Sequence, residues 1–141
     1  MFTVYLINIV VVALVVTIHY EFLHQLTRSM PRWQIRLRLR IVLGVFTALL
    51  AHAIEVWIFG IAYYLMHHAE GFGELQGNVT GTLHDCVYFS FTSYTTLGLG
   101  DIEPLGDIRY LTGIEALTGL VLITWTASFL YLQMTRYWTT D

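Results

Sequence analysis

The sequence contains very little charge. Only 12% of its 141 residues are charged, lysine does not occur at all, and cysteine occurs once, at Cys86. Soluble domains carry about 25% charged residues, so this composition, with its hydrophobic content of 56%, excludes an ordinary soluble protein. A lone cysteine excludes a disulfide within the chain. Since basic side chains are so few, we expect no nucleic-acid partner.

The apolar residues gather in three long stretches. They cover residues 1–27, 41–66 and 109–137, and each exceeds the roughly 20 residues with which a helix crosses a bilayer. The first stretch lacks a basic leader and a small-residue cleavage site, which predicts a retained N-terminal helix and not a signal peptide. Little chain remains beside the spans, so we expect no soluble regulatory domain. The sequence predicts a multi-pass protein of the plasma membrane or the bacterial inner membrane.

The arginines are unevenly distributed. Five of the seven lie in the link 28–40 between the first two spans, namely Arg28, Arg32, Arg36, Arg38 and Arg40. Positive charge in short loops stays cytoplasmic, which predicts a cytoplasmic link and C-terminus and an N-terminus outside. Arginine alternates with apolar residues here, whereas a voltage-sensing helix carries it at every third position within a span. We therefore predict an interfacial segment that contacts anionic lipid at the inner face.

The region between the second and third spans is acidic and, in this topology, faces outside. It contains Glu70, Glu74, Asp85, Asp101, Glu103 and Asp107, and no arginine occurs from residue 67 to residue 108. Such an asymmetry would concentrate cations on the outer side of the protein.

A short helix is predicted over residues 82–95, after a Gly-rich polar segment at 67–81. Thr82 and Asp85 have the spacing of a capping box. An aromatic run follows, formed by Tyr88, Phe89, Phe91 and Tyr94. The helix is too short to cross a bilayer, and a re-entrant helix is tolerated at membrane depth only when it is buried in protein or faces a water-filled cavity.

Residues 96–101, which follow this helix directly, carry the chemistry. A dehydrated cation needs a cage of oxygens, and a backbone supplies one when successive carbonyls point the same way. Gly98 and Gly100 can adopt the positive φ that such a run requires. We predict that the cation-coordinating residues are Thr96, Leu97, Gly98, Leu99 and Gly100 and that Asp101 lies at the outer mouth.

This segment resembles the selectivity filter of the potassium-channel superfamily, whose signature is Thr-Val-Gly-Tyr-Gly-Asp. The resemblance extends over residues 83–137 and is greatest to bacterial small ion-channel proteins that have an extra N-terminal span. It implies an all-α membrane protein with three transmembrane helices, a re-entrant pore helix and a filter. It also implies a homotetramer of four identical chains, passive conduction without enzymatic activity, and no cofactor besides permeant K⁺. The K⁺ ions would bind at Thr96, Leu97, Gly98 and Leu99.

The resemblance also assigns roles in the third span. Gly119 matches a hinge glycine of the inner helix, and Leu120, Ile123 and Ala127 would then line the cavity. Leu97 and Leu99 replace the usual valine and tyrosine of the signature. Because the tyrosine hydroxyl that braces the filter is missing, a weakly selective cation channel is the alternative to a potassium channel.

Ionisable residues inside the spans are expensive in a bilayer and call for a functional hypothesis. Glu115 and Glu55 lie at similar depth, level with the pore helix, and we expect them to support the filter from behind together with Thr92 of the pore helix. A different reading is a membrane metal or redox protein, because Glu21-x-x-His24 and His52-x-x-Glu55 have the spacing of metal ligands. At about 1.5 Å per residue these two pairs lie too far apart in depth to share one ion.

Overall fold

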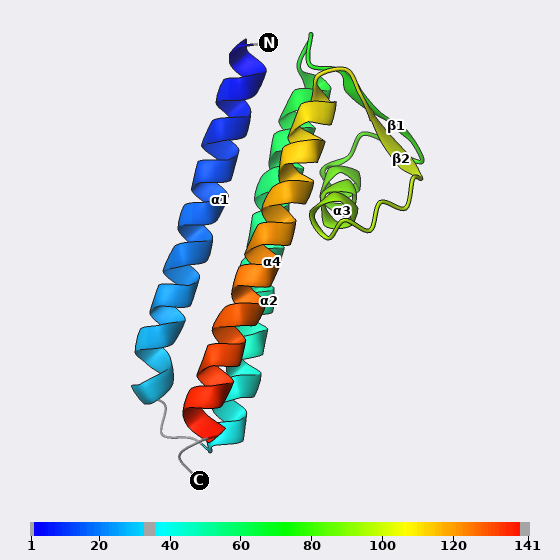
Figure 1. Cartoon of the computed structure of the whole chain (residues 1–141). Coiled ribbons are helices and arrows are strands. Elements are labelled where there is room, and N and C mark those ends of the chain that lie inside the picture. Colours follow the sequence, from blue (N-terminus) through cyan, green and yellow to red (C-terminus); the bar gives the residue numbers. More distant parts are fainter. Residues whose placement is uncertain (1, 33–35, 139–141) are drawn as a thin grey trace.

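Three long helices form the body of the protein, and all three are long and apolar enough to cross a membrane. The computed structural model describes residues 2–32 and 36–138. The long helices are α1 (Phe2–Ser29), α2 (Leu37–His68) and α4 (Ile108–Trp138). α2 and α4 lie against each other, with α1 on one side of this pair and the short helix α3 (Leu83–Tyr94) on the other (Figure 1). The prediction of a helical membrane protein with three spans is confirmed.

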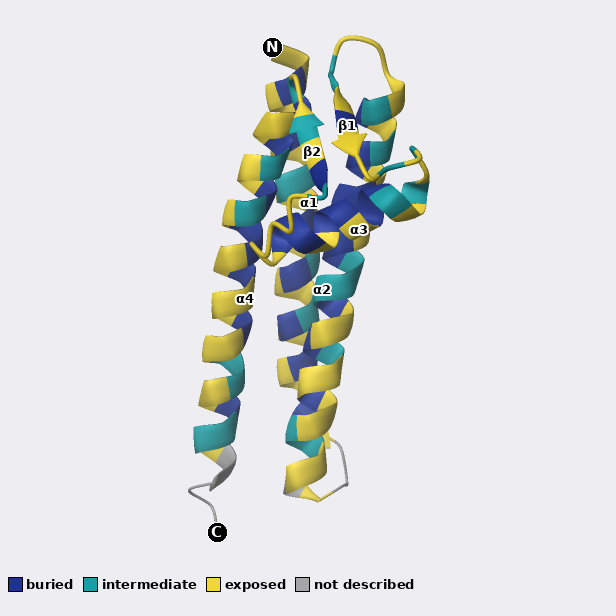
Figure 2. Cartoon of the chain, turned by 90° about the vertical axis from the view of Figure 1, so that its right-hand side faces the viewer, coloured by how far each residue is buried: buried dark blue, intermediate teal, exposed yellow. Residues whose placement is uncertain are grey.

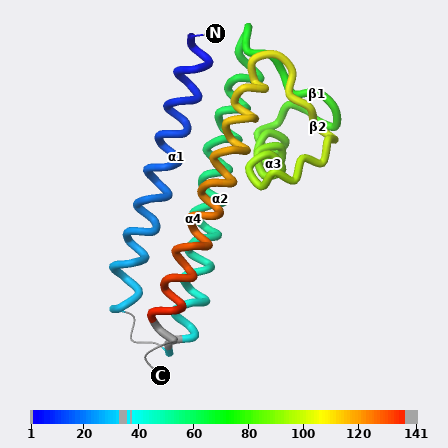
Figure 3. The backbone as a smooth tube through the Cα atoms, viewed as in Figure 1, coloured from blue at the N-terminus to red at the C-terminus, as the bar shows by residue number. Residues whose placement is uncertain are grey.

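The two ends of the bundle carry different parts of the chain. The start of α1 lies at the end that holds the region between α2 and α4, and the end of α1, the start of α2 and the end of α4 lie at the opposite end (Figure 3). After α1 the chain forms a short 3₁₀ turn, η1 (Met30–Arg32), which contains the helix-breaking Pro31. The predicted link 28–40 is too long at both ends, because α1 extends to Ser29 and α2 begins at Leu37. Arg38 and Arg40 thus belong to the first turns of α2, and residues 33–35 of the link lie outside the described residues.

The helix α3 begins with the capping box that the sequence predicts. The Thr82 hydroxyl accepts a hydrogen bond from the Asp85 N–H, and the Asp85 carboxylate accepts one from the Thr82 N–H. Asp85 Oδ2 also accepts from the N–H and the hydroxyl of Thr80, at 2.9 and 2.7 Å. These donors, those of Thr80 foremost, lower the pKa of Asp85 to about 2. A carboxylate that stays charged satisfies the first turn of the helix and complements its dipole.

A small antiparallel sheet, which the sequence did not predict, joins the segments before and after α3. Strand β1 (Glu74–Gly77) pairs with β2 (Ile102–Leu105), with Leu75 opposite Pro104 and Gly77 opposite Ile102. Leu75 and Ile102 are buried in the common core. The sheet therefore closes the stretch that contains α3 and residues 96–101 at both of its ends.

The core lies where α3 meets the α2–α4 pair. Figure 2 shows α3 largely buried, whereas residues 96–100 after it are exposed in the single chain. α2 approaches α3 through Gly60, where an added Cβ would lie 2.6 Å from Val87 Cγ2 and 2.9 Å from Val87 Cα. The largest fully buried aromatic side chains of this core are Phe59, Tyr63 and Tyr94. The re-entrant helix is thus held against two spans by close backbone approach and by aromatic packing.

Candidate functional site

The backbone of residues 96–100 alternates in conformation. Thr96, Gly98 and Gly100 have φ of 57°, 53° and 76°, and Thr96 is the one non-glycine residue with positive φ in the part of the chain that the structure describes. For a β-branched residue this conformation is strained. The positive φ predicted for the two glycines is confirmed. An alternating sign of φ is a backbone pattern that lets successive carbonyls face one side, as a cation cage requires.

Hydrogen bonds to α3 fix the direction of these carbonyls. The Thr96 N–H donates to the Ser93 carbonyl and the Gly98 N–H donates to the Thr92 carbonyl, each at 3.0 Å. In a trans peptide unit the carbonyl points opposite to the N–H. The carbonyls of Thr95 and Leu97, which share these two peptide units, therefore point away from α3.

Thr92 contacts residues 96–100 through its main-chain carbonyl and not through its side chain. Its hydroxyl donates to the Phe89 carbonyl of its own helix at 2.9 Å, while its main-chain carbonyl holds the N–H of Gly98. The contact of Thr92 with residues 96–100 is therefore made by the backbone and does not require threonine. That Thr92 supports a filter stays a prediction.

Two hydrogen bonds hold the end of the segment at Asp101. The Tyr88 hydroxyl donates to Asp101 Oδ2 at 2.9 Å, and the Asn78 N–H donates to the Asp101 carbonyl at 2.8 Å. The hydrogen bond to the Asp101 carboxylate raises the pKa of Tyr88, because it stabilises the neutral phenol. The sequence analysis missed Tyr88 as a brace. The available signal was the aromatic hydroxyl of Tyr88. Residues 96–101 run back along α3, so that Asp101 comes within hydrogen-bond distance of Tyr88.

Glu115 lies fully buried between α4 and α3. One carboxylate oxygen accepts from the Ser90 hydroxyl of α3 and the other from the Tyr63 hydroxyl of α2, both at 2.5 Å. Ser90 Oγ is also 2.8 Å from the Val56 carbonyl. Glu115 thus connects three helices behind the filter, in the position predicted from its depth. Whether it affects selectivity remains a prediction.

Glu55 makes a second buried connection, one helical turn further along α3. Its carboxylate accepts from the Tyr94 hydroxyl at 2.5 Å and contacts Nδ1 of His52 at 3.1 Å. The third partner is His19 of α1, whose Nδ1 lies 2.8 Å from Glu55 Oε1. Tyr94 is the last residue of α3, so this network reaches the base of the filter.

The sequence analysis did not identify His19. The structure buries it, with 1% of its surface exposed, whereas Glu21 and His24, one of the two pairs with the spacing of metal ligands, are exposed. The available signal was helical spacing, because His19 shares one face of α1 with Val15, Leu23 and Leu26.

Gly119 is a contact position within a continuous helix. A Cβ added there would lie 2.1 Å from the Tyr94 carbonyl oxygen and 2.9 Å from the Tyr94 carbonyl carbon, so the glycine lets α4 touch the end of α3. The structure therefore gives this residue a packing role that the sequence analysis did not expect. The hinge assigned to Gly119 stays a prediction.

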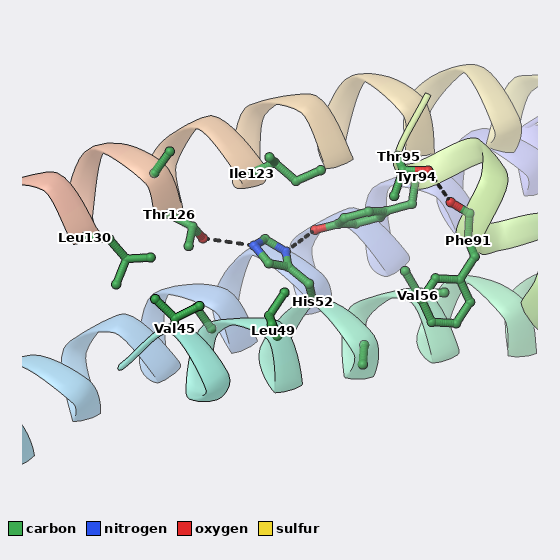
Figure 4. Close-up of a pocket in the computed structure, with 13 residues that line it drawn as sticks. Val45, Leu49, His52, Val56, Phe91, Tyr94, Thr95, Ile123, Thr126 and Leu130 are labelled. Atoms are coloured by element: carbon green, nitrogen blue, oxygen red, sulfur yellow. Dashed lines mark hydrogen bonds between the residues drawn. The ribbon is translucent and has the colours of Figure 1, made fainter. Parts of the chain in front are cut away.

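The predicted cavity-lining residues lie on an exposed face of α4. Ile123 and Ala127 line an apolar groove of about 430 Å³ between α2 and α4, next to the end of α3, and Leu120 lies outside that lining with 52% of its surface exposed. Figure 4 shows Ile123 in this groove, with His52 between Thr126 and Tyr94 on its wall. These faces are open in the single chain.

Comparison with known proteins decides the family. An ion channel family, Ion_trans_2, matches residues 51–136, which include most of α2, all of α3 and nearly all of α4. The chain belongs to this ion channel family. It is therefore a membrane protein of the potassium-channel superfamily, as the filter sequence predicts. No curated protein and no solved structure matches the chain significantly.

Proposed function

We propose that four copies of the chain form a passive cation channel that conducts K⁺ through a filter built from residues 96–100. The observation that carries this proposal is the backbone of that segment, with positive φ at every second residue and N–H groups bonded to α3. Carbonyls then point away from the protein's own core. One chain supplies a single row of carbonyls, and a ring of carbonyls around an axis needs the same row from several identical chains.

The exposed filter side chains support assembly. Leu97 and Leu99 are 63% and 59% exposed in the single chain, which is unfavourable for large apolar side chains in an acidic, water-facing region. In a tetramer these two leucines would pack against a neighbouring chain. The apolar groove lined by Ile123 and Ala127 offers a second surface for burial between chains.

Electrostatics favour a cation in this pore. The C-terminal end of α3 carries a partial negative charge and lies beside Thr95, below the filter. The acidic region around Asp101 would lie at the outer mouth and would attract cations to it. In the topology that we propose, the N-terminus is outside and the arginine-rich link 28–40 is cytoplasmic.

A weakly selective cation channel is the second candidate, and the two leucines favour it. The hydrogen bond from Tyr88 to Asp101 would brace the outer end of the filter. The side chains of Leu97 and Leu99 carry no group that could hydrogen-bond to α3. A filter braced at one end discriminates between K⁺ and Na⁺ less strictly if its middle can adapt to the smaller ion.

Reversal potentials distinguish the two candidates. Purified protein in planar bilayers, under opposed gradients of KCl and NaCl, should give currents that reverse near the K⁺ equilibrium potential. A reversal potential midway between the K⁺ and Na⁺ values would support the weakly selective channel. Currents that follow Cl⁻, or no current above that of empty bilayers, would contradict both.

A further inference from the structure

A compact polar cluster joins all four helices at the base of the filter. It consists of His19 of α1, His52 and Glu55 of α2, Tyr94 of α3 and Thr126 of α4. His19 and Glu55 are 1% and 0% exposed and the His52 side chain is 16% exposed. The ligand atoms of His19, His52 and Glu55 all lie within 4.8 Å of one another. Nothing in the conduction mechanism requires two imidazoles here.

The two histidines are oriented alike. Each directs Nδ1 at the Glu55 carboxylate, at 2.8 Å for His19 and 3.1 Å for His52. Each directs Nε2 at the one hydroxyl of Thr126, at 3.3 Å for His19 and 3.0 Å for His52. Figure 4 shows the bond from His52 to Thr126 and the 2.9 Å contact of His52 Nδ1 with the Tyr94 hydroxyl.

Counting hydrogens shows that this cluster is two short. Six contacts link the two imidazoles, the Glu55 carboxylate and the hydroxyls of Thr126 and Tyr94, and each contact needs one hydrogen. Two neutral imidazoles and two hydroxyls supply one each, and an ionised carboxylate supplies none. If Tyr94 donates to Glu55, one imidazole nitrogen has no donor; if it donates to His52 Nδ1, two oxygens lie 2.5 Å apart with no hydrogen between them. Either arrangement is costly in a buried cluster.

We propose that this cluster binds a divalent transition metal such as Zn²⁺, with His19 Nδ1, His52 Nδ1 and the Glu55 carboxylate as ligands. The metal replaces both Nδ1 hydrogens, so both histidines carry their hydrogen on Nε2 and donate it to Thr126. One hydroxyl oxygen accepts two such bonds through its two lone pairs. Metal-bound histidines almost always donate their second nitrogen to an oxygen in this way.

The Thr126 hydroxyl is then free to donate its own hydrogen to a carbonyl of its helix. Thr118 and Thr124 of the same helix already make that bond, to the carbonyls of Ile114 and Leu120. Every polar atom of the cluster is satisfied with the metal bound, which neutral histidines alone do not achieve. The ligand set of imidazole nitrogen and carboxylate oxygen is the one that Zn²⁺ prefers when thiolates are absent.

Tyr94 supplies the fourth position. Its hydroxyl oxygen lies 2.9 Å from His52 Nδ1 and 2.5 Å from Glu55 Oε2. In a tetrahedral site with bonds of about 2.0–2.1 Å, neighbouring ligand atoms lie about 3.3 Å apart, so metal binding requires the contacts of the cluster to lengthen, most of all the 2.5 Å contact between Tyr94 and Glu55. A phenolate and a carboxylate together balance the charge of a divalent cation, which suits a buried site.

The metal site would give α1 a function, whereas the formation of the pore by α2, α3 and α4 gives it none. It would tie α1 and α2 to Tyr94, two residues before Thr96, and so hold the base of the filter in place. This inference goes beyond the proposed channel and does not depend on it. Its first readout is metal binding, which is measured without any ion current.

The test uses Co²⁺, whose visible absorption reports a four-coordinate site. Full-length protein, purified in detergent and stripped with a chelator, should bind one Co²⁺ per chain with strong tetrahedral absorption, and Zn²⁺ should displace it. Glu55→Gln and His19→Gln should abolish this absorption. Thr126→Val, which keeps all the ligands, should weaken binding by about 10- to 100-fold.

Two matched variants serve as controls. His24→Gln removes an exposed histidine of α1 that stacks on Tyr20, and Thr124→Val removes an exposed hydroxyl of α4. Both should bind Co²⁺ as the unaltered protein does. The proposal is overturned if the stripped protein binds no Co²⁺, or if binding survives unchanged in Glu55→Gln and Thr126→Val. In that case the cluster is a hydrogen-bonded ring that carries an extra proton.

Discussion

The back and the front of the re-entrant segment are built differently. Behind α3, Ser90 and Tyr94 are buried and hydrogen-bonded to Glu115 and Glu55. In front, Leu97 and Leu99 are exposed apolar side chains. The back is packed within one chain, whereas the front carries apolar side chains that only the proposed assembly would bury.

This difference separates two tasks. Contacts at the back position α3, and through Thr92 and Ser93 they position the filter backbone. Side chains at the front face what we propose to be neighbouring chains. Substitutions behind α3 should therefore damage the fold of the chain, and substitutions in front should change selectivity and assembly while the chain still folds.

The largest effect is expected from Gly119→Ala. The new methyl group would overlap the Tyr94 carbonyl oxygen, so α4 or the end of α3 must move, at a cost of about 3 kcal/mol or more. Thermal unfolding of the purified protein measures this loss. The matched control is Gly113→Ala on the same helix, where an added Cβ meets nothing within 4 Å and the melting temperature should stay or rise slightly. Equal behaviour of the two variants would refute the packing role of Gly119.

The next effect is that of Glu115→Ala and Glu115→Gln. Alanine removes the carboxylate that both buried hydroxyls share and leaves Ser90 and Tyr63 only the Val56 carbonyl and the Thr112 hydroxyl as acceptors, at a cost of about 1 to 3 kcal/mol. Glutamine keeps one acceptor oxygen and should cost less. Both should alter ion selectivity or open probability in single-channel recordings, because α3 shifts against the filter. If both variants conduct as the unaltered protein does, Glu115 supports the fold alone.

Leu99→Tyr tests whether a substitution at the front of the segment changes selectivity without changing stability. A tyrosine hydroxyl could reach across to α3 and stiffen the middle of the filter, so the permeability ratio of K⁺ to Na⁺ should rise several-fold. The stability of the chain should change by less than about 0.5 kcal/mol, as for other exposed positions. Reversal potentials and melting temperatures of the same preparation provide both values. A large loss of stability with unchanged selectivity would mean that front and back are not separate.

The smallest effect concerns Asp85 at the start of α3. Its pKa is lowered in the folded protein from 3.8 to about 2, so its stabilising contribution is complete above pH 4 and is lost as the pH falls toward 2. Asp85→Asn should lower the melting temperature slightly at neutral pH, and the difference between the two proteins should shrink between pH 4 and pH 2. A difference that does not depend on pH would show that the charge of Asp85 contributes nothing.

The sequence predicted the elements whose signals are long or chemically distinctive. The three spans follow from hydrophobic length, α3 from its capping box and aromatic run, and the positive φ of Gly98 and Gly100 from their residue type. Features created by tertiary contact were missed. β1 and β2 are four residues each, too short for a periodic pattern, and they pair across the whole re-entrant segment.

Side-chain roles were harder to predict than elements. The depth of Glu115 and Glu55 placed both correctly behind α3, because rise per residue is a reliable measure along a helix. His19 was missed because its burial depends on how α1 packs against α2 and α4, which the sequence does not show. Gly119 was assigned as a hinge from a resemblance, and only the distance to Tyr94 shows its contact.

The central claim is that carbonyls of residues 96–99 bind K⁺. Solid-state NMR of protein in bilayers, ¹³C-labelled at the carbonyls of threonine, leucine and glycine, tests it most directly through an exchange of K⁺ for Na⁺. The account predicts shifts of the carbonyl resonances of Thr96, Leu97 and Gly98, with those of Gly44 and Gly113 in the spans unchanged. Filter resonances that are the same in both cations would contradict it.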